Sequence, residues 1–504
     1  MAPMIEPAEI LPPRQPSPLR VAVFAAMFAV TVAGLVLISR APQSPTAKRL
    51  DSYYYAFMGD FLTRVMLGVE SQERETSTPR AAYSADAIAE LAAQNYELAL
   101  ERRQDDLGLY VALATIYWHE GLRADAAATV AARPAPADSV KELEFRAGRF
   151  KTKAMTTLQR GLSRYSGNRT LSTLVLGFYP YTMIKPAQVE DPALQRIAAR
   201  IAPGHLLRYL LYTHAGMLQR GRAELQRAYA IGWRTVLRVS FTVVGVLIGM
   251  LAGVAIWLLV LLGRLGRPAL PVRLARLPWS VWRAAELFIL WLFLSLVFEF
   301  AAAQFVPPSE IATLPWVFSL AAAYAAAAVA AIAWFVRSAQ PESISLRDLG
   351  WRRIAPATAL CAGIAGYLAS LPAVYPVLAL VNHFIGSPAP SSPVVPIMMS
   401  ASGTAPRLVL IVLVVAAAPL AEESIFRGVL FAGLRRRMRF GGAALISALV
   451  FAGAHGQLVA LAPIAILGFV LAYVYERTGS LWASAITHAC FNAASVLALY
   501  LLMS

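Results

Sequence analysis

The sequence has little cysteine and little charge. Two of its 504 residues are cysteines, Cys361 and Cys490, and both lie in apolar stretches. So few cysteines exclude a disulfide framework and a cysteine-rich metal site. Charged residues make up only 15% of the chain, whereas apolar residues make up 58% and the mean hydropathy is +0.57. This composition excludes a water-soluble globular protein and predicts an all-α, polytopic membrane protein.

Nine apolar runs approach the roughly 20 residues that a helix needs to cross a bilayer. They cover about 21–39, 236–262, 284–304, 314–336, 356–382, 407–434, 441–459, 461–475 and 480–503. The Gly456-Gln457 break and Pro463 separate the seventh run from the eighth. The first run is too long for the apolar core of a signal peptide, and no Ala-x-Ala cleavage site follows it. We therefore expect an uncleaved signal anchor after a cytoplasmic tail of residues 1–20.

Lysine and arginine are absent from two of the loops between these runs, 305–313 and 383–406. Arginines collect instead in the segments 264–283, 337–353 and 435–439. Because short cytoplasmic loops are rich in Lys and Arg, this alternation places the three arginine-rich segments in the cytoplasm. The net charge of +16 therefore indicates orientation in a membrane, which we expect to be the bacterial cytoplasmic (inner) membrane, and it does not indicate a nucleic-acid partner.

Residues 40–235 differ from the rest, because their charges are spread at helical spacing and they have few β-branched runs. They predict a soluble helical domain, which the loop alternation places outside the cytoplasm. Five arginines between 220 and 238 favour the opposite side, but long domains translocate largely regardless of charge. We therefore expect an extracytoplasmic domain, followed by transmembrane helices over 236–344.

Part of this domain resembles a tetratricopeptide repeat. The residues at the repeat's packing positions are Tyr110, Leu113, Ala114, Tyr117, Gly121, Ala126 and Val130, with Ala92, Tyr96 and Ala99 in the preceding helix. The match covers about one and a half repeats, fewer than the three that stack stably, so an ordinary helical bundle is the alternative. Either form predicts a docking module for a protein partner. His119, His205 and His214 have no metal-ligand spacing, so we expect surface or core histidines.

Ionisable side chains interrupt three of the last apolar runs, in EESIFR (422–427), FAGAH (451–455) and HACFN (488–492). Such residues are costly in a bilayer and persist where they pair, line a cavity or carry a function. Residues four apart share a helix face. Such pairs are Glu423 and Arg427, Phe451 and His455, and His488 and Asn492. At about 1.5 Å per residue from the cytoplasmic ends of their runs, these groups lie roughly 12–21 Å deep, which predicts that they converge on one layer.

Purely structural roles are the alternative for single members of this set. Glu423 and Arg427 could form a structural ion pair, and His488 alone could make a helix–helix hydrogen bond. His383 lies at the end of an apolar run without acidic neighbours, so we expect it to be structural.

The three fragments resemble the motifs of the CAAX prenyl protease and bacteriocin-processing family (CPBP, or Abi) of intramembrane proteases. That family carries Glu-Glu-x-x-x-Arg, Phe-x-x-x-His and His-x-x-x-Asn on successive helices. The matching residues are Glu422, Glu423, Arg427, Phe451, His455, His488 and Asn492. The phrase YERTGSLWASAITHACFN (475–492) also resembles the family's approach to its last motif. The resemblance covers about 345–504 and implies a protease core there.

The resemblance implies peptide hydrolysis, and the residue types allow it. Glu422 is the expected general base, and His455 is expected to help position the water. His488 and Asn492 are expected to donate to the oxyanion, while Arg427 holds Glu423 or shapes the cavity. The family is often classed with metalloendopeptidases, and two histidines with two glutamates could bind zinc. Because the chain has no His-Glu-x-x-His motif and an asparagine suits a metal-free mechanism, we expect no cofactor.

Two other classes of protein are alternatives. One is a non-enzymatic membrane scaffold or bacteriocin-immunity protein that recruits partners through the helical domain; such members tend to lose the motif residues, whereas this chain keeps all of them. The other is a transporter, which predicts polar sites in both halves of the chain. For a protease, the candidate substrates are a prenylated CAAX protein, a short peptide, a leader sequence or a membrane protein.

Overall fold

The computed structural model describes most of the chain. The described residues are 17–40, 45–76, 84–131, 137–165, 184–264, 279–305, 313–338, 344–385, 394–401, 403–457 and 459–503. These residues form helices and no strand, which confirms the predicted all-α fold. The chain divides into two units: a membrane unit, Met1–Pro42 with Gly245–Leu497, and a helical unit, Gln43–Val244 with Ala498–Ser504.

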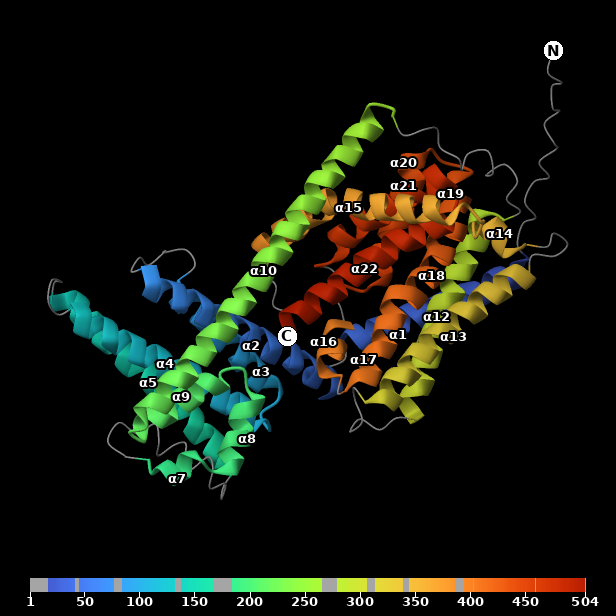
Figure 1. Cartoon of the computed structure of the whole chain (residues 1–504). Helices are drawn as coiled ribbons and strands as arrows, with labels where there is room; N and C mark the ends of the chain where they lie inside the picture. The colour runs from blue at the N-terminus through green and yellow to red at the C-terminus, as the bar shows by residue number, and fades with distance from the viewer. Residues whose placement is uncertain are drawn as a thin grey trace, which may run out of the picture. The chain divides into compact units, whose positions relative to one another are not determined.

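The helical unit is built from short and medium helices and the first half of one long helix. Its helices are α2 (Pro45–Thr76), α3 (Ala85–Arg102), α4 (Leu107–Ala131), α5 (Ala137–Arg164), α7 (Pro186–Val189), α8 (Pro192–Arg200), α9 (Gly204–His214) and α10 (Leu218–Leu261). Ser84 caps α3 by accepting from the Ala87 N–H. Asp191 is the N-cap of α8, and Pro192 is the first residue of that helix. Successive helices from α2 to α5 pack against each other around one apolar core (Figure 1).

The tetratricopeptide pattern is followed by the structure only in part. The three positions predicted on α3 are fully buried. A Cβ atom on Gly121 would come within 2.8 Å of Lys151, so α4 and α5 approach closely there. Ala126, however, is exposed, and the side chain of Val130 lies outside the described residues. Because an ordinary bundle also pairs neighbouring helices, a tetratricopeptide repeat stays a prediction.

Two of the histidines in the helical unit pair with glutamates. His119 is a core residue whose Nε2 lies 2.8 Å from Glu70 Oε2, and Tyr229 donates to the other oxygen of Glu70. His205 is half-buried, with its Nδ1 2.7 Å from Glu224 Oε2. These pairs give one ring nitrogen of each histidine a carboxylate partner.

The third histidine packs against an aromatic ring. His214 meets the ring of Trp118 edge-on, with 6.1 Å between the ring centroids. Burial lowers the pKa of His214, because desolvation disfavours the charged imidazolium. His214 is therefore a packing residue of the helical unit.

The membrane unit contains the remaining helices. They are α1 (Pro18–Arg40), the second half of α10, α12 (Val281–Phe305), α13 (Leu314–Arg337), α14 (Leu346–Leu349), α15 (Pro356–Ile385), α16 (Val394–Ser400), a composite span over 404–435, α20 (Phe440–Ala454), α21 (Leu461–Thr478) and α22 (Leu481–Met503). The predicted boundary at 235 falls inside α10, which is one unbroken helix from Leu218 to Leu261 (Figure 1). The boundary between the units lies at 244–245.

Within the described residues, seven helices are long and apolar enough to cross a membrane. They are Leu218–Leu261, Val281–Ala302, Leu314–Arg337, Pro356–Phe384, Thr404–Arg435, Leu461–Thr478 and Leu481–Leu501. These helices correspond to seven of the nine predicted runs, and the other two coincide with shorter apolar helices, Pro18–Val32 and Phe440–Ala454. The chain is an integral, multi-pass membrane protein.

Helix α20 is shorter than the run predicted over 441–459, because it ends at Ala454. His455 Nδ1 lies 2.8 Å from the Phe451 carbonyl, and Gly456 has a φ of 69°, in the left-handed region that favours glycine. These two features end the helix and turn the chain toward α21. A helix of 15 residues is about 22 Å long, which is less than the thickness of the hydrocarbon layer.

The ends of four helices that the sequence predicts to be cytoplasmic lie together. Arg20, at the start of α1, binds Glu286 near the start of α12 with 2.5 Å between Nη2 and Oε2. Arg283 donates to the Ser338 hydroxyl at 2.8 Å, which joins the start of α12 to the end of α13. Arg436, just after the 404–435 span, donates to the carbonyl of residue 279 at the start of α12. This arrangement supports the predicted alternation of these helices, since all four ends lie on one side.

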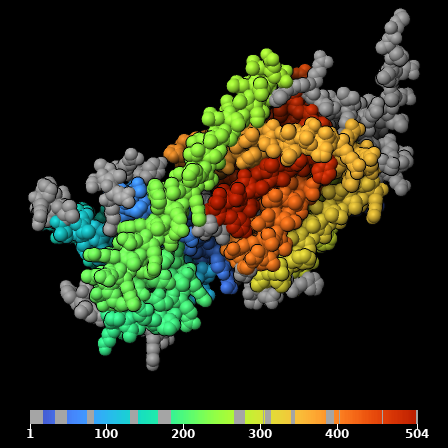
Figure 2. Space-filling model, viewed as in Figure 1, coloured from blue at the N-terminus to red at the C-terminus, as the bar shows by residue number. Residues whose placement is uncertain are grey.

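Helix α22 is positioned by close contact with α15. Figure 2 shows α22, in red, between α15 and the span over 404–435. A Cβ on Gly366 would come within 2.4 Å of Thr487 Oγ1, so only glycine allows this approach. Thr487 in turn donates to the Gly363 carbonyl at 3.0 Å. Small residues and hydroxyl groups are typical of tight helix packing in membranes, and here they fix the helix that carries His488.

Candidate active site

The span that carries the first motif is an irregular helix. It consists of α17 (Thr404–Val412), the π-helical segment η2 (Leu413–Ala417), α18 (Ala418–Glu422), the π-helical segment η3 (Glu423–Phe431) and α19 (Ala432–Arg435). Glu422 therefore lies at the end of a short α-helical piece between two wider segments. Single π-helical turns within α-helices occur frequently at functional sites.

Pro419 removes one backbone donor from this span. Ala418 donates its N–H to the Leu413 carbonyl, five residues back. The next N–H of that pattern would come from residue 419, which is a proline, so the Val414 carbonyl lacks this partner. The side chain of Asn492 takes its place, because Nδ2 donates to Val414 O at 2.8 Å. Asn492 thus ties α22 to the widened turn, and its second amide N–H is left for another acceptor.

Glu423 is the centre of a buried polar network. Its Oε1 lies 2.9 Å from Arg427 Nη1 and 3.1 Å from His488 Nδ1. Its Oε2 accepts from the Ser484 hydroxyl at 2.5 Å. Glu423 and Arg427 are both fully buried, and His488 is nearly so. Both oxygens of Glu423 are occupied, so this carboxylate holds Arg427 and His488 in place.

Arg427 is held on three sides. Besides Glu423, its guanidinium contacts the Gly468 carbonyl, which accepts from Nη2 at 3.2 Å. Its Cζ lies 4.2 Å from the centroid of the Phe451 ring, a cation–π contact. The Phe451 side chain thus packs over the ion pair and links the second motif to the first.

Glu422 has one carboxylate oxygen without a hydrogen-bond donor. Its Oε1 accepts from the Tyr324 hydroxyl at 2.8 Å. Its Oε2 is buried and makes no hydrogen bond, and His488 Nε2 lies 3.8 Å away, too far for a direct bond. A buried acceptor without a partner in the protein is rare in folded proteins and points to a bound water or a functional role. The two neighbouring glutamates therefore differ: Glu423 is fully engaged, whereas Glu422 has a free oxygen.

His455 lies at the end of α20 and is exposed. Because a carbonyl can only accept, its Nδ1 donates to the Phe451 carbonyl, which leaves Nε2 as the acceptor nitrogen of the neutral ring. The Phe451 ring contacts both imidazoles, with its centroid 4.8 Å from that of His455 and 5.7 Å from that of His488. The two histidines therefore flank one phenyl ring.

The structure brings most of the predicted site residues into one network. Glu422, Glu423, Arg427 and His488 are joined directly or at 3.8 Å, and Phe451 connects them to His455. Asn492 contacts the backbone of the same span. Two members were not predicted. Ser484 precedes His488 by one helical turn, so its spacing could have revealed it, whereas Tyr324 lies on α13 and no sequence pattern marks it.

In the part of the chain that the structure describes, no three His, Cys, Asp or Glu side chains are arranged to hold a metal ion. His488 Nδ1 faces Glu423 directly, and His455 Nδ1 is used by the Phe451 carbonyl. Both contacts use Nδ1 and leave Nε2 of each ring for another partner.

The fold and the site together are those of a membrane protein with a buried ionisable site. Two glutamates, an arginine and a histidine lie between its membrane-spanning helices. Residues 404–494, which include every motif residue, match the family described as type II CAAX prenyl endopeptidase Rce1-like. Over 74 residues the chain is 35% identical to "Putative membrane peptidase YdiL" of Bacillus subtilis (strain 168). These two matches confirm the predicted resemblance to the CPBP family.

Both similarities are confined to part of the chain. The match with YdiL covers 15% of this chain and 30% of the length of YdiL. The family match lies within the membrane unit and does not reach the helical unit. No solved structure matches the chain.

Proposed function

We propose that this chain is an endopeptidase that hydrolyses a peptide bond within the membrane, using a water molecule activated by Glu422. The observation that carries the proposal is the free Oε2 of Glu422, buried in the segment that matches the Rce1-like family. The names of that family and of YdiL both refer to peptidases, which supports this reaction class. A carboxylate that faces water in a protected site is suited to general-base catalysis.

In the proposed reaction, Oε2 of Glu422 accepts a proton from water while the water oxygen attacks the carbonyl carbon of the scissile bond. Tyr324 holds Oε1, so the carboxylate is fixed with its other oxygen available. The proton then passes to the leaving nitrogen as the C–N bond breaks. The products are a carboxylic acid and an amine.

Other residues of the network supply the remaining functions. His488 Nδ1 lies 3.1 Å from Glu423 Oε1, which orients the ring so that Nε2, when it carries a proton, can donate to the tetrahedral oxygen. The second amide N–H of Asn492 is the other proposed donor to that oxygen. The free Nε2 of His455 can accept a hydrogen bond from the attacking water. Helix α20 is shorter than the hydrocarbon layer is thick, so His455, which follows its end, lies within that layer. Non-helical backbone at that depth requires a water-filled cavity or surrounding protein.

Metal-free chemistry is part of this proposal. Purified protein treated with phenanthroline is expected to keep most of its peptide cleavage, since Glu422 supplies the base that a metal-bound water would otherwise require. Elemental analysis of the same sample should find well under one metal ion per chain. Inactivation by the chelator, with recovery on adding zinc, would contradict a metal-free mechanism and leave the peptidase proposal standing.

The substrate and the role of the helical unit are also proposals. A peptide or membrane-protein segment that enters from the bilayer suits a site buried between helices. The helical unit is proposed to dock the substrate or a protein partner, because its helices form a core of their own. A prenylated protein, a leader peptide and a membrane protein all carry the apolar segment that this route requires.

Tyr324→Phe is expected to lower kcat about tenfold or more with little change in KM, because a hydrogen bond to a charged group is lost from the proposed base and not from the substrate. The measurement is steady-state cleavage of one peptide by both proteins. Tyr367→Phe, on α15, is the matched control and should cleave like wild type. Unchanged kcat in Tyr324→Phe would contradict the positioning role of Tyr324.

A further inference from the structure

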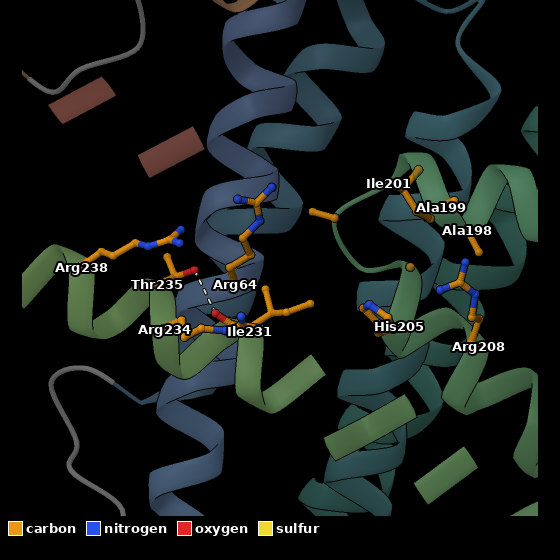
Figure 3. Close-up of a pocket in the computed structure, with 12 residues that line it drawn as sticks. Arg64, Ala198, Ala199, Ile201, His205, Arg208, Ile231, Arg234, Thr235 and Arg238 are labelled. Carbon is orange, nitrogen blue, oxygen red and sulfur yellow. Dashed lines mark hydrogen bonds between the residues drawn. The ribbon is translucent and has the colours of Figure 1, made fainter. Parts of the chain in front are cut away.

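The helical unit contains a cavity with a strongly basic lining. Its volume is about 470 Å³, within the range of small-molecule sites. Figure 3 shows Arg64 of α2 with Arg234 and Arg238 of α10 on one side, and His205 and Arg208 of α9 on the other. No Asp or Glu lines it among the described residues. Four arginines around one cavity favour an anionic ligand.

Two carboxylates lie next to this cavity, and both interact with residues of its lining. Glu224 is bound by His205 at 2.7 Å, lies 3.8 Å from Arg208 and also pairs with Arg227. Asp60 accepts from the Tyr96 hydroxyl at 2.6 Å inside the core. The four arginines of the lining outnumber these two carboxylates.

The position of two of these arginines relates the cavity to the membrane surface. Arg238 is the last charged residue on α10 before an uncharged run over 239–263. At about 1.5 Å per residue, this run is long enough to cross the hydrocarbon layer. Arg234 and Arg238 therefore lie at the level of the lipid headgroups, one turn apart on the helix.

The lining also has an apolar part. Ile201 and Ile231, together with Ala198 and Ala199, contribute to the wall of the cavity. A free phosphate ion needs no apolar wall, whereas the glycerol and the first carbons of a lipid chain do. A guanidinium fork can bind two oxygens of one phosphate group at once, which suits a phosphodiester held at this depth.

We propose that this cavity binds the phosphate headgroup of an anionic membrane phospholipid. The site lies in the helical unit and is separate from the proposed peptidase centre. Binding there would hold the helical unit against the bilayer surface. Each arginine near an anionic surface strengthens lipid binding by about fivefold, so Arg234 and Arg238 together contribute roughly 25-fold.

The test uses full-length protein purified in a neutral detergent. Phosphatidylglycerol and, separately, phosphatidylcholine with the same acyl chains are titrated in, and bound lipid is counted by native mass spectrometry. Wild-type protein is expected to bind phosphatidylglycerol at least tenfold more tightly. The double variant Arg234→Gln/Arg238→Gln should lose roughly 25-fold in affinity for phosphatidylglycerol and little for phosphatidylcholine.

Two further variants separate charge from folding. Arg220→Gln/Arg222→Gln removes two exposed arginines from the same helix, outside the cavity lining, and should bind within twofold of wild type. Arg234→Lys/Arg238→Lys keeps the charge and should keep the preference for phosphatidylglycerol, with weaker binding because lysine has no fork. If the glutamine variant misfolds, the lysine variant becomes the test. Loss of the preference for phosphatidylglycerol over phosphatidylcholine in the folded lysine variant would overturn the proposal.

Other outcomes overturn the proposal directly. Equal affinity of the wild type for both lipids would do so, as would wild-type affinity in the folded Arg234→Gln/Arg238→Gln protein. A third arm adds inorganic phosphate at the concentration of the lipid. Displacement of phosphatidylglycerol by phosphate at that concentration would assign the cavity to a soluble phosphate compound and overturn a lipid as its occupant.

Discussion

Glu422→Gln is expected to abolish peptide cleavage, with a loss of at least a hundredfold and an intact fold. The amide keeps the size of the carboxylate and can still accept from Tyr324, but it cannot take a proton from water. The measurement is the initial rate of cleavage of one membrane-partitioning peptide by purified wild-type and variant proteins, with thermal unfolding of both as the check on folding.

The control is Gln304→Ala, which changes an exposed polar residue on α12 of the same unit. It should retain the wild-type rate. Cleavage at the wild-type rate by Glu422→Gln would remove Glu422 from the role of base. If the wild type itself is inert on every peptide offered, the alternative of a non-enzymatic scaffold is favoured.

Glu423→Gln is expected to destabilise the membrane unit strongly, by about 3–5 kcal/mol, because it leaves the Arg427 charge buried without its counter-charge. Arg427 and Glu423 are both fully buried, so water cannot replace the lost partner. The measurement is the midpoint of thermal unfolding in detergent, followed by the fraction of protein that elutes as a monodisperse species.

The double variant Glu423→Gln/Arg427→Met tests the cause of that loss. It removes both charges and is expected to recover much of the stability, because no unpaired ion stays in the interior. Cleavage should stay low in the double variant, since His488 has lost the carboxylate that orients it. A single variant as stable as wild type would contradict the structural role of the Glu423–Arg427 pair.

Much of the fold follows from the sequence, because the bilayer imposes simple rules on length and polarity. Seven predicted runs are helices of spanning length. The early end of α20 was harder to predict, because the apolar pattern continues past it. That end depends on the local contact between His455 and the Phe451 carbonyl and on the left-handed backbone of Gly456.

The composition of the site could be predicted from spacing, but the division of tasks within it could not. Residues four apart share a helix face, so the Glu423–Arg427 pair was foreseeable. Which of two adjacent glutamates has a free oxygen depends on partners from other helices, namely Ser484 and Tyr324.

The partner of Asn492 depends on backbone irregularity. The Val414 carbonyl lacks its next helical donor because a π-helical turn meets Pro419, and residue types alone do not reveal such a turn. Sequence spacing suggested Asn492 as an oxyanion donor, and the structure adds a contact that fixes its side chain. The oxyanion role itself stays a proposal.

The central claim is that Glu422 activates water for peptide hydrolysis, and one measurement tests it most directly. Purified full-length protein is incubated with membrane-partitioning peptides in water enriched in oxygen-18, and the products are analysed by mass spectrometry. The wild type should yield new carboxyl termini that carry oxygen-18 from the solvent, and Glu422→Gln should yield none above background. Labelled termini formed equally by both proteins, or no cleavage by the folded wild type, would contradict the claim.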